Sequence, residues 1–213
     1  MGLVTKRQKK AKFIASILAA VPFVRMIALT GSLARGESRE DSDIDFFVVT
    51  QTGRIWTCRF FIILLLKLLG QYRTDENTAG KICPNRYQAE DSLEIYPHSV
   101  YHAKEYSQIV PLFDSGSVYQ RFQEANKWII KKIKNQRAKI KNANQNLKIK
   151  ESQVLRFLRR VGESILIGRF GDLLEEKLKN YQTKRILWDK RTYQRQARII
   201  ISDQRLCFHP KAR

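Results

Sequence analysis

The chain contains few cysteines, and they lie far apart. Among its 213 residues there are three, Cys58, Cys83 and Cys207. An odd number of widely separated thiols is neither a disulfide framework nor a zinc-ligand spacing. We therefore expect a reducing compartment, and the cytoplasm is the predicted location.

Several common site motifs are missing as well. The sequence has no phosphate loop ending in glycine-lysine-threonine and no serine–histidine–aspartate arrangement. His98 and His102 have the spacing of zinc ligands on a helix, but no acid or cysteine completes a site, so we interpret them as a surface or partly buried pair. The basic start of the chain leads into an apolar segment too short for a signal peptide, and a helix packed on a sheet is expected there.

Acidic residues are half as numerous as basic ones. Twenty Asp and Glu against forty Lys and Arg give a net charge of +20. Such a charge attracts polyanions, namely nucleic acid, nucleoside triphosphates or an acidic membrane, and it is also compatible with general solubility. With 43% hydrophobic and 28% charged residues, the chain can form a sizeable core, which argues against global disorder.

No apolar run is long enough to predict a membrane span. The most apolar one, residues 55–69, contains Arg59 and Lys67 and is shorter than the ~20 residues that a span requires. A buried helix that covers a sheet is the favoured interpretation. Contact with an anionic membrane surface stays open as a less favoured alternative.

The most informative stretch is residues 24–50. An apolar run ends at Leu29 and is followed by Gly31; Asp43 and Asp45 then precede a second apolar run. Both runs predict buried strands. Side chains two residues apart on a strand point the same way, so the two carboxylates should lie side by side, where a hard divalent cation with oxygen ligands would relieve their repulsion.

Two glycines precede the acidic pair. Gly31 and Gly36 can adopt backbone angles closed to other residues and let a ligand approach the main chain. If residues 32–35 open a helix, its first amides form an anion site. A site that transfers nucleotidyl groups holds the phosphates on backbone amides and a metal on nearby aspartates, and this stretch offers both.

The pattern Gly31-Ser32-x-x-Arg35-Gly36, then Ser42-Asp43-x-Asp45, resembles the signature of the polymerase-beta-type nucleotidyltransferase superfamily in its minimal form. The resemblance covers about residues 24–50. It implies an α/β (α+β) core, a small mixed sheet flanked by helices. It also implies that Asp43 and Asp45 are catalytic and bind two Mg²⁺ ions, and that Gly31 and Ser32 hold the phosphates.

Three roles stay open. Arg35 either binds phosphate or pairs with Glu37 or Asp41, and Ser42 either caps the turn before Asp43 or touches phosphate, with capping favoured. Members of this superfamily usually carry a third carboxylate on a neighbouring strand, but the expected strand at residues 81–87 has none. Asn85 stands in its place. Three acids follow this strand, Glu90, Asp91 and Glu94, and Glu94 is the first choice for the third carboxylate.

The remaining elements are predicted from periodicity and turn signals. We expect a helix at residues 5–20, with Phe13, Ile14, Ile17 and Leu18 on one face. Pro84 should confine its strand to an edge or a bulge. Residues 92–96 could be a strand or lead into a helix, and residues 100–110 should be a helix followed by a loop at 111–113. Further helices are expected after Gly116, among them one whose apolar side is Val154, Leu158, Val161 and Ile165.

Two units are expected, a catalytic domain at residues 1–114 and a basic helical region at residues 115–213. Within the second, residues 131–150 are rich in lysine and are either a solvated connector or a polyanion-binding strip, and residues 198–203 should be a docked tail.

The predicted reaction transfers a nucleoside monophosphate from a triphosphate to an acceptor hydroxyl, with Mg²⁺ required and pyrophosphate released. The charge favours RNA or another polyanion as acceptor, and a small molecule or a protein side chain stays open. The alternative is a non-catalytic nucleotide- or nucleic-acid-binding protein on the same scaffold, such as a toxin–antitoxin partner.

Overall fold

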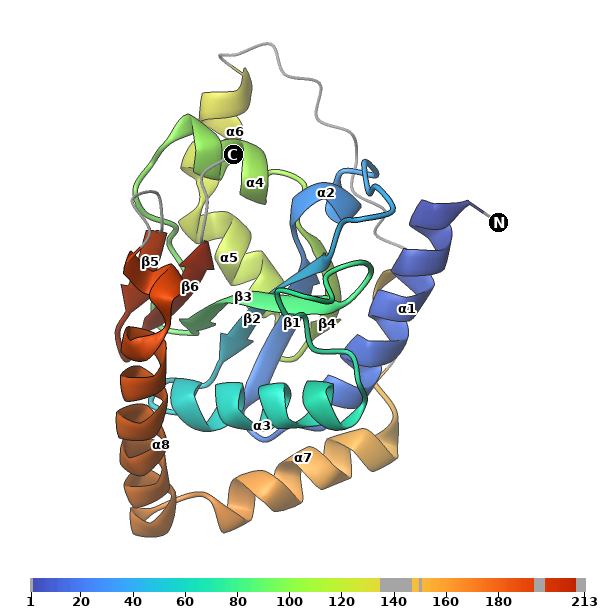
Figure 1. The fold of residues 1–213 in the computed structure, drawn as a ribbon. Helices are drawn as coiled ribbons and strands as arrows, with labels where there is room; N and C mark the ends of the chain where they lie inside the picture. The colour runs from blue at the N-terminus through green and yellow to red at the C-terminus, as the bar shows by residue number, and fades with distance from the viewer. Residues whose placement is uncertain (1, 135–146, 150, 194–197, 210–213) are drawn as a thin grey trace.

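The structure, a computed structural model, describes residues 2–134, 147–149, 151–193 and 198–209. Its α-helices are α1 (Leu3–Leu18), α2 (Gly31–Ala34), α3 (Ile55–Leu68), α4 (Val100–Tyr106), α5 (Val118–Ala125), α6 (Lys127–Lys134), α7 (Gln153–Ile165) and α8 (Arg169–Trp188), and a 3₁₀ helix, η2, spans Lys190–Tyr193 (Figure 1). Its strands are β1 (Val24–Leu29), β2 (Ile44–Thr50), β3 (Ile82–Ala89), β4 (Val110–Asp114), β5 (Arg198–Ile201) and β6 (Arg205–His209).

The strands form one mixed sheet in the order β4-β1-β2-β3-β6-β5. The pair β2–β3 is parallel, and the other four pairs are antiparallel. Helices pack on both faces of the sheet, and the helices from α5 to α8 come after β4 in the chain. The fold class predicted from the sequence is therefore confirmed.

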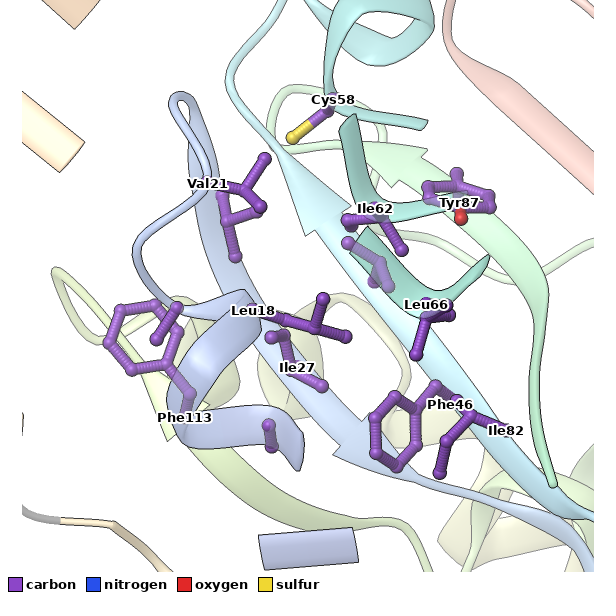
Figure 2. Close-up of a cluster of buried hydrophobic side chains, with 14 of the residues drawn as sticks. Leu18, Val21, Ile27, Phe46, Cys58, Ile62, Leu66, Ile82, Tyr87 and Phe113 are labelled. Carbon is purple, nitrogen blue, oxygen red and sulfur yellow. The ribbon is translucent and has the colours of Figure 1, made fainter. Parts of the chain in front are cut away.

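Both faces of the central strands are buried, which explains why β1 and β2 read as continuous apolar runs. Ile27 and Phe46 point into a core shared with α1 and α3, whereas Met26 and Phe47 point into a second core shared with α4, α5 and α6. Figure 1 shows the two sets of helices on opposite sides of the sheet, and Figure 2 shows the first core.

Helix α3 confirms the predicted covering helix at residues 55–69. Ile62 and Leu66 are buried against β2 and β3 (Figure 2). Glu175 of α8 accepts the backbone N–H groups of Trp56 and Thr57, at 2.9 and 2.8 Å, and so satisfies donors in the first turn of α3. Within the described residues, no helix has both the length and the apolar character needed to cross a membrane.

Helix α1 lies where it was predicted, but one residue of its predicted buried face is misplaced. Ile14 and Leu18 are buried, whereas Phe13 is 64% exposed. The buried stripe also includes Arg7 and Ala11, so it follows the three- and four-residue spacing of a helix, and Phe13 lies about 100° away from Ile14 around the axis.

Downstream of β3, the strand alternative for residues 92–96 was wrong, and so were the predicted end of the next helix and the loop after it. Residues 92–96 form neither strand nor helix and lead towards α4, which was the other alternative; the Asn126 side chain accepts the N–H of Ile95 and donates to the carbonyl of Leu93. The helix expected at residues 100–110 ends at Tyr106, and the expected loop is strand β4. β4 pairs with β1 across a register shift, and Pro111 is tolerated there because β4 is an edge strand of the described sheet.

Strand β3 contains the bulge that Pro84 predicted. Phe46 pairs with Pro84 and Phe47 pairs with Arg86, so Asn85 is the extra residue. The strand is internal to the sheet rather than at its edge, but the described part of β6 pairs with β3 from Arg86 onward, so Pro84 needs no partner on that side.

The region after residue 114 is mainly helical, as expected, and it also supplies two strands. The predicted docked tail at residues 198–203 contains β5, and β6 pairs with β3 through Cys207 and Arg86. The division at residue 114 stays a prediction, since the sheet combines strands from both sides of it. Most of the basic stretch at residues 131–150 lies outside the described residues.

Candidate active site

The two aspartates of the motif lie side by side at the start of β2. Asp43 precedes the strand, and Asp45 is its second residue. A carboxylate oxygen of each and the Cys83 sulfur lie within 4.8 Å of one another. Cys83 is the register partner of Asp45 on the parallel strand β3. The pair therefore has the same-side geometry expected from the strand periodicity.

The electrostatics of this pair favour a bound cation. Burial raises the pKa of the Asp45 carboxyl well above its usual range, and the carboxylates of Asp43 and Glu105 raise it further. Two acids this close are ionised together when positive charge lies between them, and oxygen ligands suit a hard divalent ion. The residues present thus fit Mg²⁺.

Gly31 brings the backbone of α2 against this acid. Its φ is +67°, in the left-handed region, and a Cβ built on it would lie 2.3 Å from the Asp45 Oδ2. The N–H of Thr30 also donates to the Asp45 carbonyl at 3.1 Å. Only glycine satisfies both the backbone angle and the close approach, so this position is specified by the acid beside it.

Glu105 of α4 is a site residue that sequence analysis missed. Its carboxylate accepts the backbone N–H of Gly31 and lies 3.4 Å from the Arg35 Nη1. Burial raises the pKa of Glu105, and the Arg35 guanidinium opposes that shift. An anionic group therefore occupies two of the donors that were predicted to bind phosphate. Nothing in the sequence near Glu105 signals this contact, which joins residues about seventy positions apart.

Two of the predicted phosphate ligands, Arg35 and Ser42, have protein partners close by in the sequence. Arg35 pairs with Glu37 at 3.0 Å, one of the two partners anticipated for it. The Ser42 hydroxyl accepts the N–H of Arg39 at 3.2 Å, the favoured capping role. Ser32, on α2, is partly exposed next to Gly31.

Comparison with known proteins decides the family. The model of a family described as "Nucleotidyltransferase domain" matches residues 10–156, well over half of the chain. The chain belongs to the nucleotidyltransferase domain family. The match extends far beyond residues 24–50, where the motif lies.

One solved structure is also similar. It is described as "Crystal structure of the toxin-antitoxin with AMP-PNP", and the similarity covers 59% of this chain and 84% of that chain at 17% identity, with a TM-score of 0.32. Among curated protein sequences, none matches this chain.

In this nucleotidyltransferase domain the position expected for a third carboxylate holds an amide. The Asn85 Nδ2 donates to the Asp45 Oδ1 at 2.6 Å. Glu94, the first choice from the sequence, instead accepts one hydrogen bond from the Tyr96 hydroxyl and pairs with His98. Glu90 pairs with Arg25 and Arg121. It also follows Cys83 by seven residues along the chain, roughly 23 Å in an extended strand, so it cannot reach the pair.

Arg73, on the loop before β3, supplies positive charge to the acids. Its Nε lies 3.1 Å from the Asp43 Oδ2, and its guanidinium hydrogen-bonds the Cys83 thiol. Burial raises the pKa of that thiol, which keeps it neutral and a weak ligand for a hard ion. Of the three groups that could hold a metal ion here, the two carboxylates therefore suit a hard ion better than the thiol does.

A hollow of about 120 Å³ opens beside the acids on the β3 side. It shares Arg73, Cys83 and Asn85 with the acidic site, and the C-terminal elements close it. Because the sheet order is β1-β2-β3, α2 and this hollow flank Asp45 on opposite sides. The remaining lining residues are Arg59, Tyr72, Pro84, Ile186, Asp189, Thr192, Ile199 and Phe208.

Proposed function

We propose that this protein is a metal-dependent nucleotidyltransferase that moves a nucleoside monophosphate from a nucleoside triphosphate to an acceptor hydroxyl. The observation that carries the proposal is the side-by-side placement of Asp43 and Asp45 directly against Gly31. The bond from the α-phosphorus to the bridging oxygen breaks, a bond to the acceptor oxygen forms, and pyrophosphate and the hydroxyl proton leave.

Asp43 and Asp45 are the proposed metal ligands, for two Mg²⁺ ions. When bound, such ions neutralise charge on the phosphates and lower the pKa of the attacking hydroxyl. The protein's own part is to hold the two carboxylates together in a partly buried place and to orient Asp45 through Asn85.

Gly31, Ser32 and Arg35 are the proposed ligands of the β- and γ-phosphates, with Ser42 as a less favoured contact. The Glu105 contact supports this, because an anion already accepts the Gly31 N–H beside Arg35. A triphosphate that binds here must displace that carboxylate, and it brings more charge and more acceptor oxygens to the same donors.

The acceptor is proposed to enter from the β3 side. In-line displacement requires the attacking oxygen and the leaving pyrophosphate on opposite sides of the α-phosphorus. With pyrophosphate on α2, the opposite side is the hollow lined by Arg59 and Arg73. These two guanidinium groups favour an acceptor with a negative group near its hydroxyl, as in RNA or another polyanion.

A second candidate is a nucleotide-binding protein without turnover, and Asn85 is the observation that favours it. An amide cannot accept the proton of an attacking hydroxyl as a carboxylate can. Without a third acid, metal binding is also weaker, because one negative charge is missing.

Turnover measured with α-³²P-labelled triphosphates and Mg²⁺ separates the two. Radiolabel transferred to RNA, to small phosphorylated molecules or to the protein itself identifies the acceptor class. Transfer that is lost in Asp43→Asn and Asp45→Asn but retained in Asp41→Asn, an exposed acid of the same loop, supports the enzyme. Transfer unaffected by the first two changes excludes the assigned site, and binding without transfer to any acceptor favours the second candidate.

A further inference from the structure

Helix α7 presents an apolar face to solvent. Its outer side carries Val154, Phe157, Leu158, Val161 and Ile165, which are 65%, 65%, 51%, 39% and 63% exposed. Their spacing places all five on one stripe of the helix. Three more exposed apolar side chains continue from the end of α7 into α8, so that the α7 apolar surface comprises these five together with Ile167, Phe170 and Leu173.

The inner side of α7 is docked through charged and polar contacts. Arg159 is buried and pairs with Glu151 at 2.7 Å, and its guanidinium also lies 5.0 Å from the centre of the Phe113 ring. Glu163 pairs with Arg25 at 2.6 Å. Gly162 lies so close to Pro22 that a Cβ would be 2.5 Å from its ring. These contacts fix the rotation of the helix.

This arrangement is the reverse of an ordinary amphipathic helix on a core. Arg159 and Glu163 face inward and are paired, and the apolar stripe faces outward. In Figure 1, α7 runs along the end of the molecule opposite α2, with no labelled element beyond it. An exposed apolar stripe of this extent is uncommon on a soluble monomer and marks an interaction site.

The charge around the stripe identifies the partner. Arg156, Arg160 and Arg169 are exposed around it, and Arg156 pairs with Glu151 at 3.0 Å. Glu151 and Glu163 also pair with the inward-facing Arg159 and with Arg25, and the exposed Asp172 of α8 pairs with Arg54. An apolar stripe beside arginines is the composition of a helix that lies in the interface of an anionic bilayer. Two copies of this chain, each with a net charge of +20, would bring like charges together across the same surface.

We propose that the α7 apolar surface docks on an anionic lipid bilayer, with Phe157, Leu158, Ile165 and Phe170 entering the acyl boundary and the arginines contacting the headgroups. Docked in this way, the candidate active site faces away from the membrane, because α2 and α7 lie at opposite ends of the molecule. The proposal is independent of the chemistry at Asp43 and Asp45.

Flotation of the full chain with vesicles tests the proposal. Wild-type protein should float with vesicles of phosphatidylcholine and phosphatidylglycerol, and less with phosphatidylcholine alone. Ile165→Glu and Phe157→Glu should each weaken binding by about tenfold or more, since each removes a buried apolar side chain from the lipid. Ile130→Glu is the matched control, because Ile130 is also an exposed helical isoleucine (47%) but belongs to α6, a helix at the other end of the molecule from α7.

The changed residues are exposed, so the variants should keep the wild-type melting temperature. An equal loss of vesicle binding in Ile130→Glu and Ile165→Glu would overturn the proposal, and so would failure of the wild type to float with anionic vesicles. Light scattering provides a further check: a dimer in solution that Ile165→Glu separates, without any vesicle binding, would assign the surface to a second copy instead.

Discussion

The side-chain amide of Asn85 donates a 2.6 Å hydrogen bond to the carboxylate of Asp45. Where a third acid is expected beside the proposed metal-binding pair, the chain thus places a neutral donor whose hydrogen bond favours the ionised form of Asp45. This substitution lowers the negative charge of the site by one and removes a proton acceptor.

Restoring the acid should therefore change both stability and activity. In Asn85→Asp, three carboxylates crowd together, so without divalent ions the melting temperature should fall by several degrees. Mg²⁺ should raise it again, and by more than it raises that of the wild type. We expect nucleotidyl transfer to increase by about tenfold or more, because a general base contributes about 10²–10⁴-fold in rate. Asn85→Ala, which only removes the hydrogen bond, should lose about 1 kcal/mol of stability without gaining activity.

Gly31→Ala should abolish tight nucleotide binding. The new Cβ would lie 2.3 Å from the Asp45 Oδ2, at a φ of +67°. Either Asp45 or the start of α2 must move, so the Kd for a triphosphate with Mg²⁺ should rise by at least about tenfold. Gly36→Ala is the matched control: its φ of +74° imposes similar backbone strain, about 1–2 kcal/mol, but no atom lies within 4 Å of its Cβ. Equal affinity loss in both variants would contradict the account.

Glu105→Gln should strengthen triphosphate binding, because the wild-type carboxylate occupies the Gly31 N–H and lies beside Arg35. An uncharged amide competes less well for these donors. Isothermal titration calorimetry checks the affinity. Glu37→Gln is the control, because Glu37 also pairs with Arg35 but is exposed. An unchanged affinity in Glu105→Gln would show that the carboxylate does not compete with phosphate.

The raised pKa of Glu105 predicts that the free energy of unfolding depends on pH. The pKa of Glu105 is raised in the folded protein above its ordinary value of 4.5, mainly by burial. The folded state therefore binds this proton more tightly than the unfolded chain, and the stabilisation is complete below pH 4.5 and lost as pH rises through the folded pKa. In urea titrations, the free energy of unfolding of Glu105→Gln, measured relative to wild type, should increase as pH rises across that window. A difference that does not vary with pH would contradict the raised pKa.

The parts of the site that the sequence predicted are those held by local geometry. Asp43 and Asp45 share a side because of strand periodicity, and Gly31 lies two residues after the end of β1. Asn85 was noted because its predicted strand lacked an acid. Glu105 and Arg73 were missed because their contacts depend on how α4 and the loop before β3 pack, which no local pattern encodes.

The fold shows the same division. The helix at residues 55–69 and the bulge at Pro84 follow from hydrophobicity and from the missing proline N–H. β4 was missed because its pairing with β1 joins segments about eighty residues apart. The apolar stripe of α7 was predicted, but its exposure to solvent was not. A hydrophobic stripe alone does not show whether the protein's own core or another partner covers it.

The most direct test of the central claim measures binding of a non-hydrolysable triphosphate analogue by calorimetry, with and without Mg²⁺. The account predicts Mg²⁺-dependent binding that Asp43→Asn and Asp45→Asn each weaken by at least about tenfold, while Asp41→Asn binds as the wild type does. Binding of equal affinity without Mg²⁺, or unchanged in both variants, would contradict the claim that the two carboxylates beside Gly31 hold divalent ions around a triphosphate.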